Sequence, residues 1–305
     1  MSRNTKIAIS LVLLQSILLG FGDPISKNAY ASISVYSLLT VRYWIAFIFI
    51  MLVFGRKVIK GLKGCDLKAL ILPSICIAAT YLISNVAINL TSPTSVAFLR
   101  STATVWTPLL ALLVFRKHYS RKHLPILAFM MLGLYLLCCP DGNLKPGMGE
   151  ICALLSAVMA AGSLVFAQDA LDKADALTIT AIQTLTSAVM ATVCAFTLEG
   201  GVDMQDATPG IWMIILYLAV VCTVGGYMLQ NCALKDIAAS SVALLQCTYP
   251  VMTAFFSFFI LSERLAFSGI AGSVIILLCV VSENFVSARE ESVCVSDIKN
   301  MQTNI

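Results

Sequence analysis

The sequence predicts an all-α integral membrane protein with ten transmembrane helices in two inverted five-helix repeats. Three observations predict this class. Hydrophobic residues make up 59% of the 305 positions and charged residues 12%, which is far too apolar for a soluble domain. Apolar windows long enough to cross a bilayer recur along almost the whole chain. A segment of the first half also recurs, without a gap, in the second half.

The apolar windows predict helices, because each is a continuous run and membrane strands would alternate in polarity. A helix needs about 20 mainly apolar residues to cross the hydrocarbon core. The short connections leave no room for a soluble domain, so the helices have to carry the function. The ten windows are residues 7–27, 35–55, 69–89, 95–115, 123–140, 148–168, 176–198, 209–231, 238–260 and 266–286.

The basic residues predict which side each loop occupies. With an internal amino terminus, the inner segments hold 15 of the 20 lysines and arginines, the outer segments hold 3, and Arg42 and Arg100 lie within spans. Loops rich in lysine and arginine stay in the cytoplasm. We therefore expect a multi-pass protein of the cytoplasmic cell membrane with both termini inside, ending in a disordered cytoplasmic tail, 287–305.

An internal repeat divides the chain. Seven of 19 positions match when residues 81–99 are aligned with residues 227–245, an offset of 146. Composition alone would not align a tyrosine and an asparagine, four residues apart, in both segments. We therefore expect a first half, 1–143, and a second half, 144–286, each with five helices. Because five is odd, the second half enters the membrane from the opposite side, as in the inverted repeats of secondary transporters.

Four motifs carry a family resemblance that covers residues 7–286. They are "LLGFGDPISK" in the first span, "LLTVRYWIAF" in the second, "SVAFLRSTATVWTPLLALLVF" in the fourth and "SSVALLQCTYPVMTAFFSFFILSER" in the ninth. With the ten spans and the repeat, they resemble the drug/metabolite transporter superfamily, in particular its EamA-type exporters. The first half departs from the pattern, with Lys117 where Glu263 falls in the second. The resemblance implies alternating-access export of a small polar metabolite, and an amino-acid-like solute is our first expectation.

Polar side chains form stripes on four of the predicted spans. Residues three or four apart share one face of a helix, and polar faces inside a membrane must contact protein or water. Because the stripes lie at repeat-related places, we expect them to enclose one substrate cavity between the halves. The stripe residues are Tyr81 and Asn85 on the third span, Arg100, Thr104 and Thr107 on the fourth, Thr223, Tyr227 and Asn231 on the eighth, and Gln246, Tyr249, Pro250 and Thr253 on the ninth.

Two arginines lie inside predicted spans. A charge near the middle of a helix costs about 2.5–3.5 kcal/mol to insert, so we interpret Arg100 as the anchor of a substrate carboxylate or phosphate. The alternative is a structural arginine that is satisfied by helix carbonyls or by Asp23. Arg42 lies opposite Gln183 at an offset of 141. It either contributes to the site, snorkels outward or pairs structurally.

Asp23 lies in "GFGDPIS", where two glycines and a proline predict a broken first span. Such a span can bend during transport, and its carboxylate is a candidate for proton coupling. The alternative is a structural pair with Arg42 or Lys27.

The sequence lacks the usual signatures of catalysis and of metal binding. We find no Walker lysine loop, nucleophile elbow, paired carboxylates or metal-ligand set, and His118 and His123 do not share a helical face. We therefore expect no catalytic residue, no metal and no cofactor. The expected partners are a small-molecule substrate and the lipid bilayer, with no nucleic acid, and the sequence leaves a homo-oligomer open.

Three other functions remain as alternatives. Within transport, the alternative is a facilitator or exchanger of nucleotide-like or cationic drug-like solutes. A membrane-embedded enzyme acting on lipid-linked substrates would need acidic residues clustered at a loop mouth, and the loops are short and poor in them. A structural or sensory bundle would leave the duplicated polar stripes without a use.

Overall fold

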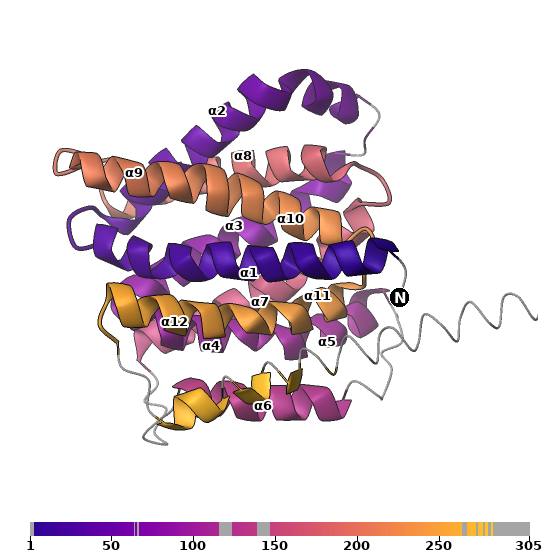
Figure 1. The fold of residues 1–305 in the computed structure, drawn as a ribbon. Helices are drawn as coiled ribbons and strands as arrows, with labels where there is room; N and C mark the ends of the chain where they lie inside the picture. The colour runs from indigo at the N-terminus through magenta and orange to yellow at the C-terminus, as the bar shows by residue number, and fades with distance from the viewer. Residues whose placement is uncertain are drawn as a thin grey trace, which may run out of the picture.

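The structure is a computed structural model, and the residues that it describes form helices joined by short connections (Figure 1). The basic loop at 116–123, with Lys117, His118 and His123, and the tail 287–305 lie outside the described residues. The described residues are 3–63, 65, 67–115, 124–138, 147–263, 267–272, 274–276, 278–279 and 282.

The helices of the first half follow the predicted windows closely. Pro93 is the first residue of α4, and the Ser92 side chain caps this helix by accepting a hydrogen bond from the Ser95 N–H, as is usual for a helix start. The helices are α1 (Arg3–Ala29), α2 (Val35–Leu62), α3 (Leu67–Leu90), α4 (Pro93–Ser101), α5 (Ala103–Phe115) and α6 (Leu124–Cys138).

The second half repeats this order. The side chains of Asp175 and Thr208 cap α8 and α9 by accepting hydrogen bonds from backbone N–H groups. The elements are α7 (Met148–Ala170), α8 (Ala176–Leu198), α9 (Pro209–Tyr217), a π-helical stretch (Leu218–Gly225), α10 (Gly226–Ala233), α11 (Ala239–Leu245), a 3₁₀ turn (Gln246–Thr248), α12 (Tyr249–Ile260) and a short apolar helix (Phe267–Ile276).

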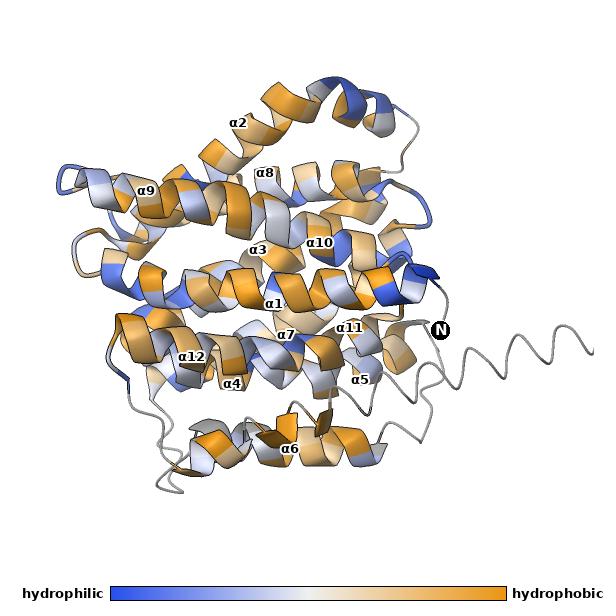
Figure 2. Cartoon of the chain, viewed as in Figure 1, coloured by the Kyte–Doolittle hydropathy of each residue, from blue (hydrophilic) through white to orange (hydrophobic). Residues whose placement is uncertain are grey.

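Within the described residues, eight helical segments are long and apolar enough to cross a membrane. The other two predicted spans coincide with α6 and with the helix Phe267–Ile276, which are apolar but shorter. Figure 2 shows that hydrophobic residues predominate along the middle of the bundle, whereas hydrophilic residues gather toward its two ends. The fold is therefore that of a multi-pass membrane protein.

The prediction of a broken first span was wrong. Helix α1 runs without interruption through Gly20, Gly22 and Pro24. The glycines instead allow close packing, since a Cβ on Gly20 would lie 2.6 Å from the Cβ of Met252. The interruptions occur in the fourth, eighth and ninth spans, at Thr102, at the π-helical stretch and at the 3₁₀ turn.

The packing of the helices follows the repeat. Helix α3 packs along α7, and α10 packs along α1; these are equivalent contacts when α1 is aligned with α7 and α3 with α10. Likewise, α4 and α5 pack on α7 as α12 packs on α1, and α2 packs on its own counterpart α8. The first helix of each half therefore packs largely against the other half, which places the interface of the halves at the centre of the bundle.

One contact illustrates the correspondence. Cys76 and Cys222 are 146 residues apart, and each packs against a glycine of the facing helix. A Cβ on Gly162 would lie 3.2 Å from the sulfur of Cys76, and one on Gly22 would lie 2.8 Å from the sulfur of Cys222. The small residues bring these helix backbones together, as is common in membrane bundles.

Candidate functional site

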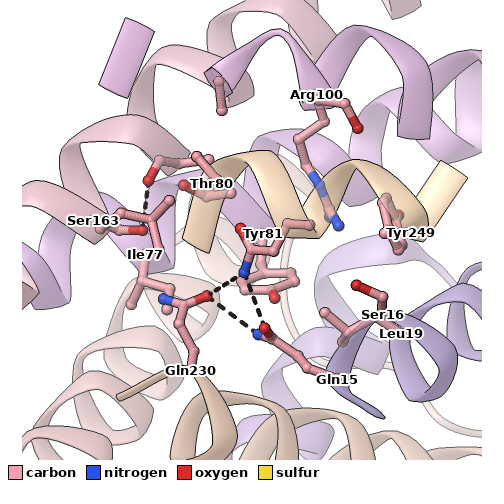
Figure 3. A pocket seen from close by; sticks show the side chains of 16 residues that line it. Gln15, Ser16, Leu19, Ile77, Thr80, Tyr81, Arg100, Ser163, Gln230 and Tyr249 are labelled. Carbon is pink, nitrogen blue, oxygen red and sulfur yellow. Dashed lines mark hydrogen bonds between the residues drawn. The ribbon is translucent and has the colours of Figure 1, made fainter. Parts of the chain in front are cut away.

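A cavity lies at the interface of the two halves (Figure 3). Its volume is about 50 Å³. That is enough for several waters. The cavity is lined by Gln15, Ser16 and Leu19 of α1, Ile77, Thr80 and Tyr81 of α3, Arg100, Ser101 and Ala103, Ala160, Ser163 and Leu164 of α7, and Gln230, Ala243, Gln246 and Tyr249.

Arg100 is the charged residue among those that line the cavity. Its guanidinium carbon lies 4.2 Å from the centre of the Tyr249 ring and 5.5 Å from that of Tyr81. Its Nη1 donates one long hydrogen bond, 3.4 Å, to the hydroxyl of Ser84. A guanidinium has five N–H donors, so most of its donors remain available for an anion.

Three glutamines from three spans, Gln15, Gln230 and Gln246, meet at the wall of the cavity; Figure 3 labels the first two. The Nε2 of Gln246 donates to the side-chain oxygens of Gln15, at 2.9 Å, and of Gln230, at 3.0 Å. Gln15 donates in turn to Gln230, at 3.2 Å, and to the carbonyl of Gly226. This network joins the first span to the eighth and ninth without using any charge.

The arginine and the glutamines occupy equivalent places. Ser84 and Gln230 are 146 residues apart, as are Arg100 and Gln246. Arg100 donates to Ser84 in one half, and Gln246 donates to Gln230 in the other. Both halves therefore contain an interhelical hydrogen bond at this position. Its donor is charged in the first half and neutral in the second.

The helices also break at the same place in both halves, directly after these residues. Thr102 interrupts the fourth span, and its hydroxyl donates to the Leu99 carbonyl at 2.6 Å. In the ninth span, the hydroxyl of Thr248 donates to the Leu245 carbonyl at 2.9 Å. Thr248 ends the 3₁₀ turn Gln246–Thr248. Such mid-helix interruptions frequently mark functional hinges.

Four of the predicted site residues, Arg100, Tyr81, Gln246 and Tyr249, line this cavity, whereas Thr104 and Thr107 do not. Both threonines are buried, and Thr107 bonds the carbonyl of Ala103 in its own helix. Thr104 lies against the ninth span, 2.9 Å from the sulfur of Cys247. The prediction that these residues share a face assumed an unbroken helix across Thr102. The helix is interrupted there, so the residues after Thr102 face another way.

The remaining predicted residues of the third and eighth spans lie beside the cavity. The ring of Tyr227 contacts that of Tyr81, with centres 5.4 Å apart and planes tilted by 34°. Asn85 accepts a 2.6 Å hydrogen bond from the Tyr30 hydroxyl, and Asn231 donates to Gln183 at 2.8 Å. The two asparagines therefore act as interhelical hydrogen-bond partners.

Asp23 and Arg42 are the other charged residues well inside α1 and α2. Arg42 is 3% exposed and donates from Nε to the Thr223 hydroxyl at 2.9 Å, with its guanidinium 5.4 Å from the Tyr43 ring centre. The Oδ2 atom of Asp23 is buried and has no hydrogen-bond partner among the described residues.

The expected pair between Asp23 and Lys27 is not formed, because Lys27 has other partners. Its ammonium donates to the carbonyls of Ile88, Asn89 and Thr91, at 2.8, 2.8 and 3.1 Å. These carbonyls lie at the carboxyl end of α3, where a positive charge is favourable. Lys27 is therefore a cap of α3, and Asp23 has no ion pair within the part of the chain that is described.

Gln15, Ser84 and Gln230 were missed by the sequence analysis. Two signals were available for them. Ser84 and Gln230 are a polar pair at the repeat offset of 146, and Gln15 is the one amide in the otherwise apolar middle of the first window. Single polar residues on an apolar helix have no stripe to identify them, so periodicity alone passes over them.

Comparisons with known proteins agree with this architecture. The model of the EamA-like transporter family matches the chain twice, over residues 6–139 and 147–282. The uncharacterized transporter YyaM of Bacillus subtilis (strain 168) is 24% identical over 250 residues, which are 78% of this chain and 79% of that one. An uncharacterized transporter of Archaeoglobus fulgidus is 22% identical over 268 residues, 88% of this chain and 82% of that one.

A solved crystal structure has the same fold. It superposes with a TM-score of 0.76 at 12% sequence identity and covers 95% of this chain and 99% of the other. The family match covers both halves separately, in agreement with the two-repeat packing. This chain belongs to the EamA-like transporter family.

Proposed function

We propose that the protein is a secondary transporter that moves a small polar solute by alternating access, with its two halves rearranging around the central cavity. The observation that carries this proposal is a cavity between the halves whose lining includes Arg100 with most of its hydrogen-bond donors free. Interfaces of repeats near the middle of the membrane are where secondary transporters hold their substrates. The helix breaks beside Arg100 and Gln246 would let each half bend at the site.

In this proposal, the chain spans the cytoplasmic membrane ten times, as two inverted repeats over residues 1–143 and 144–286. Helix α6 and the short helix Phe267–Ile276 would be the fifth and tenth spans. The repeat-related contacts of α1 and α7 support this layout. In a cysteine-free background, a single cysteine at Lys60 should be shielded from an impermeant external thiol reagent and one at Gln205 should be labelled. The reverse pattern would overturn the assignment of sides.

The proposed direction is export, and the proposed solute carries an anionic group that binds Arg100. A cationic drug-like solute is disfavoured, because the charged residue in the cavity lining is itself a cation. The test is solute counterflow in proteoliposomes loaded with a metabolite extract, comparing the wild type with protein-free vesicles. Uptake of at least one solute against the empty control supports transport. No exchange of any solute by a folded protein would overturn the proposal.

A further inference from the structure

The charges buried between the helices do not balance. Away from the helix ends, the described part of the chain has three charged side chains that are not exposed, namely Asp23, Arg42 and Arg100. With Asp23 ionised their sum is one positive charge, and with Asp23 protonated it is two. These three side chains therefore carry a net positive charge in either state.

The immediate partners of the two arginines are all neutral. Arg42 contacts the hydroxyl of Thr223 and the ring of Tyr43. Arg100 contacts the hydroxyl of Ser84 and two tyrosine rings. Hydroxyls and aromatic faces stabilise a guanidinium, but they do not cancel its charge.

Among the described residues, the second half does not supply the missing negative charge. The offset is 141 over the first two helices of each half, where α1 and α7 end at Ala29 and Ala170 and where α2 and α8 begin at Val35 and Ala176. Asp23 therefore corresponds to Leu164 and Arg42 to Gln183, while Arg100 corresponds to Gln246 at the offset of 146. Within the described residues, no carboxylate forms an ion pair with either arginine. A positive charge in a membrane interior is costly unless an anion accompanies it. Since the described residues do not supply that anion, we infer that a bound solute does.

Arg100 lines the cavity and Arg42 does not. We therefore place this anion in the cavity, beside Arg100. The rest of the cavity wall consists of neutral polar groups and of apolar or aromatic side chains. An ammonium group would therefore find no carboxylate among the lining residues, whereas a carboxylate would find the free donors of Arg100. A zwitterion would bring its own cation beside an existing excess of positive charge.

We propose that the cavity selects small monoanions, a single carboxylate on an uncharged body, over zwitterions of the same shape. This inference rests on the proposed transport function and replaces the amino-acid-like solute as the preferred class. The solute would contribute the negative charge that the two halves lack, and with Asp23 ionised the bound complex would be neutral. Such a solute would move through the protein with its charge compensated by Arg100.

The test uses sets of solutes that share a skeleton and differ in charge. Lactate, lactamide, alanine and alaninamide form one set, and their phenyl derivatives form a larger one. Binding is measured on the purified protein by calorimetry and by the shift in melting temperature, which rises with ligand affinity. We expect the hydroxy acid of at least one set to bind at least tenfold more tightly than the matching amino acid, with the aminoamide weakest.

Two variants separate charge from shape. In Arg100→Gln, the ratio of hydroxy-acid to amino-acid affinity should fall to about one. In Arg100→Lys, affinity should fall while the ratio stays above one, because the charge remains without its fork. Each variant is checked for monodispersity and melting temperature, so a misfolded sample is recognised. Asp23→Asn, which removes a negative charge, should keep or increase the preference for the hydroxy acid.

The outcomes also separate this inference from transport itself. Amino acids binding as tightly as their hydroxy acids, or none of the eight solutes binding, would overturn the selection of monoanions. Counterflow of a zwitterionic or neutral solute in the same vesicles would overturn it while leaving the transport function standing. Absence of counterflow for every metabolite in the extract would instead count against transport.

Discussion

Between the helices of the first half lie charged side chains, whereas the equivalent positions of the second half are neutral. The two halves share a fold, a hydrogen bond between the third and fourth spans or their counterparts, and a helix break. Neutral residues at these positions are thus sufficient for the shared fold, so the charges of the first half serve something other than folding. The pairs are Asp23 and Leu164, Lys27 and Gln168, Arg42 and Gln183, and Arg100 and Gln246.

Lys27 is the informative exception among the charged residues. It binds three carbonyls at the end of α3, while Gln168 donates to the carbonyl of Ile237 and accepts from the N–H of Ala239. Both residues therefore tie the end of their helix to the loop after the third span or its counterpart. Here a charged and a neutral residue do the same structural task, which distinguishes Lys27 from Asp23 and Arg100.

The largest effect is expected from neutralising Asp23, the acidic side chain among Asp23, Arg42 and Arg100. If Asp23 carries a proton in transport, Asp23→Asn should abolish accumulation driven by a pH gradient and leave solute exchange intact, because exchange needs no net proton movement. Proteoliposome uptake with and without an imposed gradient measures both. Intact accumulation would make Asp23 structural, and loss of exchange as well would mean that it has a wider role than coupling.

The second effect concerns Arg100, whose substitution by glutamine copies the other half. Loss of a charge-assisted hydrogen bond of about 1.5–3 kcal/mol should lower substrate affinity roughly ten- to hundredfold. The variant should fold at least as well, since a costly charge leaves the membrane. Binding and melting temperature measured on the same sample decide, and unchanged affinity with lowered stability would make Arg100 structural.

A double variant sharpens the same comparison. Adding Gln246→Arg to Arg100→Gln moves the charge to the equivalent place in the second half. The partner of Tyr249 under the repeat is Ala103, so the moved arginine would lack one of the two tyrosine rings. We expect the affinity to stay low, and a full rescue would mean that the position of the charge within the cavity is unimportant.

The third effect is on stability. It tests whether a residue of the first half can always be replaced by its counterpart from the second half. Gly20 corresponds to Ala161, but a Cβ on Gly20 would lie 2.6 Å from the Cβ of Met252 and 2.9 Å from the Thr253 nitrogen. Gly20→Ala should therefore destabilise the protein by about 1–3 kcal/mol through overpacking, read as a lower melting temperature. A neutral result would mean that α1 and α12 separate easily.

The smallest effect is expected at Lys27. Lys27→Gln copies Gln168 and keeps a donor for the end of α3 while removing a favourable charge, which is worth about 0.3–1 kcal/mol. Melting temperature should fall slightly and substrate affinity should not change. A tenfold loss of affinity would place Lys27 among the residues that act on the substrate.

The sequence predicted the repeat and the part of the site that depends on it. Tyr81 and Tyr227 were paired by their offset, and their rings meet in the structure. Arg100 was found because a charge in an apolar window stands out. Thr104 was wrongly predicted to line the cavity, because helical periodicity does not reveal the break at Thr102. Gln15 was missed because its partners lie on spans more than 200 residues away.

The packing of α1 has a consequence for how the chain is made. Gly20 packs against Met252, and Gln15 bonds Gln230 and Gln246. The face of α1 that carries them therefore has no native partner until the eighth span is synthesised, and it is not fully covered until the ninth. At about 5–20 residues per second, the 232 residues between Gly20 and Met252 take roughly 10–50 s. During that time α1 sits beside lipid or the insertion machinery. A first half made alone would keep this face uncovered, and two separately synthesised halves would have to find each other before either is complete.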